Sequence, residues 1–481
     1  MSLITDLTAA LGAAHVLTGA DTARYRDDPT THFPSDPAIV VRPGSTDQVA
    51  EVLRIAARHK QPVIPCAGRT GITGAIQNSG GLMLSVERMN RIREIRPEAR
   101  IAIVEAGVIL STLHDAAEAQ GLYFPLWFGA RGSAMIGGVL STNAGGSNVL
   151  RYGSTRSLCL GLEVVLADGQ VLNLMSALHK DNSGYDLKQM FIGAEGTLGV
   201  ITAAVMKLVP KPRAYATAML AVRSLPDALI LLNRLQTATG GIVEAFEYMP
   251  DTYMRRLAQV RPDIRQPFTP IHPVNILVEL GATRPDDATP RDDGTMPVTA
   301  LLESTLAQMM DEGMVLDAEI AQSDGQRLAL WKRRELASDI MQAVQPSIDT
   351  DICLPLDAIP AFLDRIHARL TQMDPGAETV TVSHLGDGNL HFSIFPSRHD
   401  DAIHDLAVTA VEDEVAHFQG SFSAEHGVGV MKLNSMARRK SPVALEVMRA
   451  VKAALDPEGR MNPGKVIPPR SLPLSAQVIT K

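Results

Sequence analysis

The sequence predicts an α+β protein built from two main units. Short β-rich runs mix with helix-type patterns up to about residue 212, where Pro210-Lys211-Pro212-Arg213 forms the clearest linker. A second mixed unit starts near residue 214 with a strand-type run followed by a helix-type run. The chain has 481 residues, 45% of them hydrophobic, which is enough for two or three domains. We expect a lead-in over 1–34, a first unit over 35–213, a second over 214–430 and a C-terminal helical segment over 431–481.

The first unit begins with a helix-type lead-in and then alternates strands with helices. Ser45 or Thr46 can cap a helix that runs to His59, because apolar residues recur there at helical spacing. The runs 38–41, 62–65 and 82–84 are typical of strands. A glycine-rich loop follows the second of these strands.

The second unit is expected to hold strands, helices and one exposed loop. The Pro-rich and charged stretch 284–297 is interpreted as that loop. The expected strands are 215–222, 351–354 and the two arms of a hairpin near 378–395, and the expected helices are 226–239, 325–344, 358–372 and 401–418. The hairpin indicates that the sheet of this unit is antiparallel. The C-terminal segment is expected to hold a further helix over 442–455.

Composition excludes several classes of function. The net charge is −8 and no basic block occurs, which disfavours nucleic acid and anionic membrane as partners. The three cysteines are odd in number and lack CxxC spacing, so a reducing compartment is expected. The N-terminus lacks a signal-peptide pattern, and the longest apolar run, 198–206, is far shorter than a membrane span. We expect a cytoplasmic protein without a transmembrane segment, and a homodimer as the commonest oligomer.

Two histidines flank a predicted hairpin turn. Asp387-Gly388 lies between two β-rich runs and is typical of a type I′ turn. With Asp387-Gly388 at the turn centre, His384 would pair directly with His391. Directly opposed residues share one face of a sheet, with Cβ atoms about 5 Å apart. Two imidazoles at that spacing can bind one metal ion, although a hairpin with two unrelated histidines explains the pattern equally well.

Three glycine-rich segments of the first unit, 66–75, 129–146 and 193–199, suggest a ligand held close to the backbone. Glycine allows positive φ and exposes backbone N–H groups to an anion. None of the segments is a GxGxxG, which argues against a nicotinamide dinucleotide site. The first segment lacks the Lys-Ser/Thr of a P-loop, which argues against a nucleoside triphosphate site. A single such segment is more often a set of tight turns. Three together favour an extended dinucleotide such as FAD.

At this point the chain resembles a known family. The segment 63–71 resembles the pyrophosphate loop of the vanillyl-alcohol-oxidase-type (PCMH-type) flavoproteins. The resemblance is closer over 137–146, 150–153, 161–169, 180–187 and 193–202. Together with the hairpin, these segments make the chain similar to the D-2-hydroxyglutarate and D-lactate dehydrogenase branch over roughly 35–468. It implies a PCMH-type FAD-binding domain, an α+β cap or substrate domain, and a C-terminal segment that returns to the FAD domain.

The resemblance also implies which residues bind FAD. No histidine occurs between Cys66 and Ala75, where family members with covalent flavin carry one, so noncovalent FAD is expected. The implied FAD-binding residues are Cys66, Ala67, Gly68, Arg69, Thr70, Gly71, Gly74, Ala75, Ser133, Gly138, Thr142, Asn143, Gly146, Gly196, Gly199, Val200, Ile201 and Asn462.

A third segment, Ser423-Ala424-Glu425-His426-Gly427-Val428-Gly429, completes the expected site. A regular strand would send Glu425 and His426 to opposite faces, but the two glycines allow the backbone to bend. His384, His391 and Glu425 form a two-histidine, one-carboxylate set that is typical of catalytic metal sites. In the family these positions bind a divalent metal, often zinc. The simpler alternative is a hydrogen-bonded polar core.

His426 is the candidate base, because it follows a metal ligand without being one itself. Oxidation of a 2-hydroxy acid removes a hydroxyl proton and a hydride from Cα, and the hydride goes to flavin N5. A bound metal would lower the hydroxyl pKa and orient the substrate. The alternative role for His426 is to orient a metal ligand.

The substrate carboxylate is expected to meet an arginine. Arg334 and Ser338 are four residues apart on a predicted helix and would share a face, while Lys332 and Arg333 are expected in solvent. Arg334 matches the family's carboxylate-binding arginine, and Ser338 stands where D-2-hydroxyglutarate members have a threonine. Asp349 aligns with the lysine that those members use for the second carboxylate. An anion there would repel a distal carboxylate, which widens the expected range to lactate and other D-2-hydroxy acids.

The leading hypothesis is therefore an FAD- and metal-dependent dehydrogenase of D-2-hydroxy acids that passes electrons to an electron-transfer flavoprotein or a quinone. An oxidase of the same fold that uses oxygen is a second hypothesis. A flavin- or metal-binding protein without turnover is a third.

Overall fold

The computed structural model describes residues 2–26, 30, 32–398 and 401–470. Contacts divide the chain into two compact units. The first comprises Met1–Gly145, Ser154–Val209 and Glu425–Lys481, and the second comprises Gly146–Gly153 and Pro210–Ala424. The end of the expected C-terminal segment, 471–481, lies outside the described residues. Among the described helices, none is both long and apolar enough to cross a membrane.

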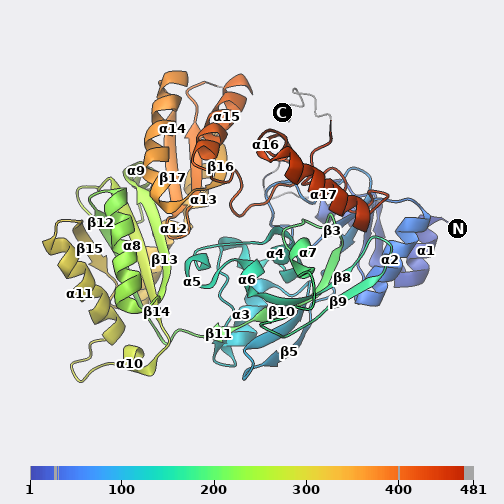
Figure 1. Ribbon diagram of the computed structural model, residues 1–481, viewed down its shortest axis with the longest axis horizontal. Helices are drawn as coiled ribbons and strands as arrows, with labels where there is room; N and C mark the ends of the chain where they lie inside the picture. The colour runs from blue at the N-terminus through green and yellow to red at the C-terminus, as the bar shows by residue number, and fades with distance from the viewer. Residues whose placement is uncertain (1, 27–29, 31, 399–400, 471–481) are drawn as a thin grey trace. The chain divides into compact units, whose positions relative to one another are not determined.

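The first unit contains two sheets (Figure 1). The four-stranded sheet has the order β1-β2-β4-β3, in which β2, β4 and β3 run parallel. The five-stranded sheet has the order β5-β6-β10-β8-β9 and is antiparallel. The bounds are β1 (Val16–Thr18), β2 (Ile39–Val41), β3 (Val63–Cys66), β4 (Leu82–Ser85), β5 (Ile92–Arg96), β6 (Ile101–Glu105), β8 (Cys159–Val165), β9 (Val171–Leu174) and β10 (Val200–Lys207).

The helices of the first unit follow from local sequence signals. The Ser45 hydroxyl accepts the Gln48 N–H at 3.2 Å and caps α2, as expected for a serine before an apolar-periodic run. Val49, Val52 and Leu53 of α2 are fully buried against the parallel sheet. The helix bounds are α1 (Leu3–Leu11), α2 (Thr46–Arg58), α3 (Leu110–Glu118), α4 (Ile136–Thr142), α6 (Thr155–Leu158), α7 (Lys188–Phe191), α16 (Leu433–Arg439) and α17 (Pro442–Leu455). Two short strands, β7 (Leu122–Tyr123) and β11 (Val209–Pro210), lie outside these sheets.

The C-terminal segment pairs with β3, the strand that precedes the first glycine-rich loop. Val63 of β3 donates its N–H to the Arg460 carbonyl at 2.9 Å and accepts the Asn462 N–H at 2.9 Å. Met461 between them is fully buried in the core of the parallel sheet. Lys452 of α17 donates to Asp456 and to the Met461 carbonyl at 2.7 Å, which closes the turn between helix and strand.

The second unit is built on one seven-stranded antiparallel sheet of order β15-β12-β14-β13-β17-β18-β16 (Figure 1). Side chains alternate between its faces, as a period of two requires. One face packs on α8, α11, α14 and α15, and the other packs on α9, α12 and α13. The strands are β12 (Ala214–Val222), β13 (Val243–Pro250), β14 (Val274–Ala282), β15 (Val315–Ile320), β16 (Ile348–Cys353), β17 (Glu378–His384) and β18 (Asn389–Phe395). The helices are α5 (Val149–Tyr152), α8 (Leu225–Thr239), α9 (Asp251–Val260), α10 (Pro285–Ala288), α11 (Pro297–Asp311), α12 (Asp324–Glu335), α13 (Ala337–Gln342), α14 (Ile359–Met373) and α15 (Asp401–His417).

Two expected elements of this unit differ in the structure. The single helix expected over 325–344 is divided at Leu336, which ends α12 and precedes α13. The expected loop 284–297 contains the short helix α10, which begins with Pro285 at a position where proline needs no N–H partner.

The register expected for the histidine hairpin is wrong. His384 pairs with Asn389 and His391 pairs with Val382, so the loop has four residues instead of two. Gly388 has a φ of +85°, but Asp387 does not have the positive φ that a type I′ turn requires. Neighbouring segments hold the longer loop, because the Gly386 N–H donates to the Phe246 carbonyl at 3.2 Å and the Gly388 carbonyl accepts the Leu354 N–H at 3.0 Å. Both histidines still lie on one face, and their ring centroids are 5.4 Å apart.

Candidate functional site

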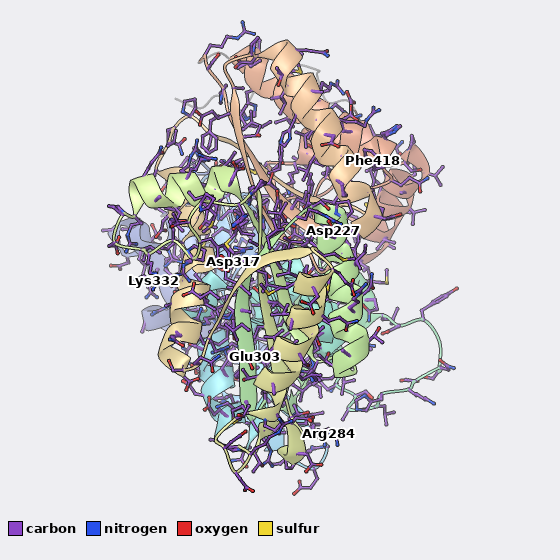
Figure 2. All side chains as sticks on the ribbon, turned by 90° about the vertical axis from the view of Figure 1, so that its left-hand side faces the viewer. Asp227, Arg284, Glu303, Asp317, Lys332 and Phe418 are labelled. Atoms are coloured by element: carbon purple, nitrogen blue, oxygen red, sulfur yellow. The ribbon has the colours of Figure 1, made fainter. Side chains whose placement is uncertain are left out.

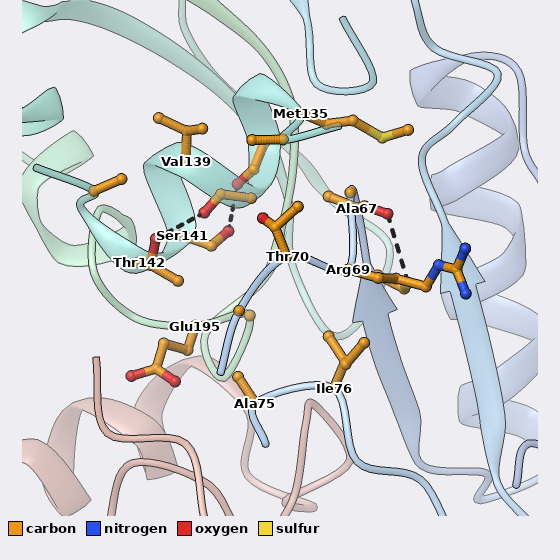
Figure 3. Close-up of a pocket in the computed structure, with 18 of the residues that line it drawn as sticks. Ala67, Arg69, Thr70, Ala75, Ile76, Met135, Val139, Ser141, Thr142 and Glu195 are labelled. Atoms are coloured by element: carbon orange, nitrogen blue, oxygen red, sulfur yellow. Dashed lines mark hydrogen bonds between the residues drawn. The ribbon is translucent and has the colours of Figure 1, made fainter. Parts of the chain in front are cut away.

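The first unit contains a large pocket formed by five chain segments (Figure 3). The loop after β3, Val86 after β4, helix α4 with its flanks, the glycine-rich turn before β10, and Glu425 with His426 all contribute to its lining. The expected FAD-binding residues that line it are Cys66, Ala67, Gly68, Arg69, Thr70, Gly71, Ala75, Gly138, Thr142, Gly196, Gly199, Val200 and Ile201.

The loop after β3 presents a run of backbone donors. Within the described residues, the N–H groups from Gly68 to Ile72 have no hydrogen-bond acceptor. Gly71 is exposed and its neighbours are half-buried, so these N–H groups are open to a ligand, and consecutive N–H groups in a loop can form a concave site for an anion. A side chain at Gly68 would overlap the Ser133 carbonyl oxygen, whereas Gly71 faces open space. The residues present therefore fit a phosphate-bearing ligand such as FAD.

The two hydroxyls at the end of α4 are already oriented. Ser141 donates to the Gly137 carbonyl at 2.6 Å and Thr142 donates to the Gly138 carbonyl at 3.2 Å (Figure 3). Their remaining lone pairs can accept hydrogen bonds from a ligand in the pocket. Cys66 also lines the pocket, and burial raises the pKa of its thiol to about 12. The thiol stays protonated, so it is a poor nucleophile toward a flavin.

Five expected FAD-binding residues do not line the pocket. Gly74 packs against Phe33 and Val430, and the Ser133 backbone packs on Gly68. Asn143 ends α4 with a φ of +51°, and its side-chain oxygen accepts the Arg156 N–H at 2.9 Å. Gly146 belongs to the second unit, and Asn462 lies behind the pocket wall. The four that belong to the first unit shape the backbone around the pocket instead of lining it.

Several lining residues were not expected from the sequence. They are Pro65, Ile72, Ile76, Val86, Phe128, Ala130, Ala134, Met135, Gly137, Val139, Ser141, Ala144, Gly145 and Glu195. Most are apolar, and a ligand that contacts apolar side chains leaves no motif in a sequence. The sequence offers a signal for Ser141 and Glu195, because both lie inside the glycine-rich segments 129–146 and 193–199.

His426 and Glu425 line the same pocket of the first unit. The chain bends directly after them, with φ of +82° at Gly427 and +51° at Gly429, as the sequence predicts. The His426 Nε2 and the nearer Glu425 oxygen are 3.9 Å apart, and the imidazole is about one-third exposed. The Thr73 hydroxyl donates to the His426 carbonyl at 3.4 Å.

In the second unit, one buried carboxylate connects the candidate arginine to a candidate metal ligand. Glu247 of β13 is fully buried, and its oxygens lie 2.7 Å from Arg334 Nε and 2.9 Å from His384 Nδ1. Burial alone would raise the pKa of Glu247, but the nearby His384 and Arg334 lower it below 4.5. A carboxylate bonded to Nδ1–H places the imidazole lone pair on Nε2, the arrangement typical of metal-binding histidines. His384 is therefore oriented as a metal-binding histidine would be.

Arg334 has an unsatisfied buried nitrogen. Its Nη2 makes no hydrogen bond to any described residue, although the side chain is nearly buried. Such an atom is costly unless a ligand completes its hydrogen bonds. A carboxylate is the natural complement, since guanidinium and carboxylate groups pair at two points.

His391 lies beside a second buried carboxylate. It pairs with Asp351 across β16 and β18, and its Nδ1 is 3.9 Å from the Asp351 carboxylate. The same carboxylate accepts the Asn389 side-chain N–H at 2.9 Å and the Ala424 N–H at 3.2 Å. The Asn389 side-chain oxygen is buried and makes no hydrogen bond to a described residue.

The remaining candidate substrate residues differ in their exposure. Asp349 is exposed, and it accepts hydrogen bonds from Ser393 at 2.5 Å and from Ser347 at 2.9 Å. Ser338 is exposed on α13, while Arg334 is buried on α12, so the expected shared face is interrupted at Leu336.

The two basic neighbours of Arg334 behave differently. Lys332 is exposed as expected (Figure 2). Arg333 is buried, and the expectation that it lies in solvent is wrong. Its Nε donates to the Arg265 carbonyl at 2.9 Å, and a second guanidinium nitrogen lies 3.4 Å from the Glu319 carboxylate. The periodicity of the helix does not reveal such partners from distant segments.

Comparison with known families decides the classification. The FAD binding domain family matches residues 37–175, and the C-terminal domain family of FAD linked oxidases matches residues 211–466. The chain belongs to the FAD-linked oxidases. Both the glycine-rich loop after β3 and the histidine hairpin lie inside the matched regions.

Relatives within this family align over almost the whole chain. A D-2-hydroxyglutarate dehydrogenase of Stutzerimonas stutzeri is 37% identical over 474 residues, which cover 97% of this chain and 98% of that protein. A D-2-hydroxyglutarate dehydrogenase of Xanthomonas citri is 34% identical, with 94% of each chain covered. A mitochondrial D-2-hydroxyglutarate dehydrogenase of Bos taurus is 36% identical, covering 89% of this chain and 77% of that protein.

Solved structures confirm the fold. A p-cresol methylhydroxylase with substrate bound superposes with a TM-score of 0.71 at 16% identity, over 96% of both chains. A 4-ethylphenol oxidase from Gulosibacter chungangensis superposes with a TM-score of 0.68 at 19% identity, over 97% of both chains. The expected PCMH-type α+β fold is therefore confirmed.

Proposed function

We propose that this FAD-linked oxidase family member is an FAD-dependent dehydrogenase that oxidises D-2-hydroxy acids to 2-oxo acids. The relatives named as D-2-hydroxyglutarate dehydrogenases support the reaction class. The observation that carries the proposal is the pocket of the first unit, which combines unpaired backbone donors with the His426 side chain.

His426 acts as the base. Its imidazole lines the flavin pocket, where it would take the hydroxyl proton of the substrate on a ring nitrogen as the Cα–H bond breaks. FAD, when bound, accepts the hydride at N5. We infer noncovalent binding, because the segment Cys66 to Ala75 has no histidine and the Cys66 thiol stays protonated.

Arg334 binds the substrate carboxylate. The unpaired Nη2 donates to one carboxylate oxygen, while Glu247 holds the guanidinium by Nε. Charge-assisted hydrogen bonds of this kind are about twice as strong as neutral ones. Ser338 is a further candidate contact for substrates that extend beyond the hydroxy acid.

His384, His391 and Glu425 are the proposed ligands of a divalent metal, for which zinc is the first candidate. When bound, the metal polarises the substrate hydroxyl and lowers its pKa. The proposal is supported by the Glu247–His384 hydrogen bond and by the shared face of the two histidines. Glu425 directly follows Ala424, whose N–H is bonded to Asp351 opposite His391.

Asp349 should disfavour substrates with a second carboxylate at that position. Its carboxylate is held by Ser393 and Ser347, and like charges in contact repel each other. We therefore propose monocarboxylic D-2-hydroxy acids such as D-lactate beside D-2-hydroxyglutarate. An electron-transfer flavoprotein or a quinone is the proposed acceptor.

The test is anaerobic bleaching of the flavin absorbance by D- and L-lactate and by D- and L-2-hydroxyglutarate, before and after chelation and zinc add-back. We expect reduction by D-isomers only, loss on chelation and recovery with zinc. His426→Ala should reduce its flavin at least about a hundredfold more slowly, because general bases contribute about 10²–10⁴-fold. Unchanged reduction in His426→Ala would contradict the catalytic role, and rapid peroxide formation in air would indicate an oxidase.

A further inference from the structure

A buried carboxylate holds the loop that carries the proposed base. Glu195 lines the flavin pocket, and the residue is 5% exposed. One of its oxygens accepts the Val428 N–H at 2.7 Å and the other accepts the Gly429 N–H at 2.9 Å. Figure 3 shows the Glu195 side chain at the edge of the pocket. Both donors lie within three residues of His426, in the first unit.

A second clamp continues along the same loop. The Thr73 carbonyl accepts the N–H groups of Val430 at 3.0 Å and Met431 at 3.2 Å. Four consecutive backbone donors are therefore held, two by a side chain and two by the flavin loop after β3. A Cβ at Gly427 would lie 2.8 Å from a Glu195 oxygen, so the loop follows this path only with glycine there.

The backbone of Glu195 is itself fixed to the pocket walls. Its N–H donates to the Ser141 carbonyl of α4 at 2.8 Å. Its carbonyl accepts the Asn462 side-chain N–H at 2.7 Å, and Asn462 also donates to the Ala75 carbonyl at 3.0 Å. Glu195 stands at a φ of +49°, which few residues other than glycine adopt. The position of its carboxylate is therefore set by the flavin pocket.

We propose that Glu195 is a positioning residue that holds the His426 loop against the flavin pocket, a role that rests on His426 being the base. A carboxylate can accept both loop N–H groups, whereas a glutamine amide has one acceptor and presents N–H groups to the other donor. Replacement of Glu195 by glutamine would release Gly429 or Val428. Displacement of a catalytic group by about 1 Å can cost about a hundredfold in rate.

The experiment compares Glu195→Gln with His426→Ala, with the double variant and with Glu105→Gln as control. Glu105 is a buried carboxylate of the same unit that also accepts a backbone N–H, from Arg91 at 3.0 Å, and it does not line the pocket. The rate of anaerobic flavin reduction is measured with whichever of D-lactate and D-2-hydroxyglutarate reduces the natural protein faster. Hydrogen–deuterium exchange over 426–432 reports the loop directly.

We expect Glu195→Gln to slow flavin reduction ten- to a hundredfold, to add nothing in the His426→Ala background and to raise exchange at Val428 and Gly429. Glu105→Gln should leave the reduction rate unchanged. Equal slowing by Glu195→Gln with and without His426, or natural exchange protection at Val428 and Gly429, would overturn the proposal. If His426→Ala alone reduces at the natural rate, the proposed base is wrong, and the exchange data still decide whether Glu195 holds the loop.

Discussion

Replacement of Glu247 by glutamine should weaken zinc binding through a residue that is not itself a proposed ligand. Glu247 is fully buried, and its two oxygens serve His384 at 2.9 Å and Arg334 at 2.7 Å. Glutamine has nearly the same shape but only one oxygen. Its NH₂ group must therefore face either the imidazole N–H or the guanidinium, both of which are donors.

The expected size of the effect follows from these two hydrogen bonds. A hydrogen bond to a charged group contributes about 1.5–3 kcal/mol, and a factor of ten corresponds to about 1.4 kcal/mol. If the bond to His384 is lost, the imidazole is no longer held in one tautomer and orientation, and zinc affinity should fall about 10–100-fold. If the bond to Arg334 is lost, a nearly buried cation is left without its counter-charge, and the KM for the hydroxy acid should rise.

Competition between the protein and a chelator of known affinity measures the zinc affinity. Glu279→Gln is the matched control, because Glu279 is another buried carboxylate on the neighbouring strand and pairs with Arg327 at 2.6 Å. Both variants should lose stability in urea, but only Glu247→Gln should lose zinc affinity. Natural zinc affinity in Glu247→Gln, together with a stability loss equal to that of the control, would refute the reasoning.

Two further predictions test the substrate range and the pH dependence. Asp349→Lys should raise the ratio of kcat/KM for D-2-hydroxyglutarate over that for D-lactate at least about tenfold, because a cation replaces the anion held by Ser393 and Ser347; an unchanged ratio in steady-state assays would contradict the role of Asp349. Burial alone would raise the pKa of Asp456, but Lys452 and two backbone N–H groups lower it below 3.8. Its stabilisation is therefore present above the unfolded-state pKa and is lost as the pH falls through the folded-state value. In thermal melts, Asp456→Asn should be less stable than the natural protein at pH 7, with a smaller difference at pH 3.5; an equal difference at both pH values would argue against this linkage.

Local chemistry in the sequence predicted the elements and many of the chemical groups of the site. Ser45 predicted the start of α2, because a serine hydroxyl caps the helix wherever the helix lies. The glycine-rich segment after β3 predicted an anion-binding loop, since consecutive open N–H groups depend on neighbouring φ and ψ values. The bend after His426 was predicted by Gly427 and Gly429 for the same local reason.

Turn chemistry failed where contacts with distant segments hold the loop. Asp387-Gly388 favoured a two-residue turn, but the structure has a four-residue loop whose Gly386 N–H and Gly388 carbonyl bond to Phe246 and Leu354. The two histidines nevertheless share a face, because a two-residue shift on one strand preserves the alternation of side chains. Arg333 shows the same limit, since its partners come from segments far away in the sequence.

The sequence by itself determined the α+β fold class and the family resemblance, and it supplied the predicted residues for flavin, metal and base chemistry, because motifs and periodicity lie within short segments. Only the tertiary structure revealed the two buried carboxylates. Glu247 joins Arg334 to His384 across 87 and 137 residues, and Glu195 holds the loop after His426 across more than 230. Hydrogen bonds between such distant residues cannot be predicted from sequence spacing, because each partner lies on a different strand or loop.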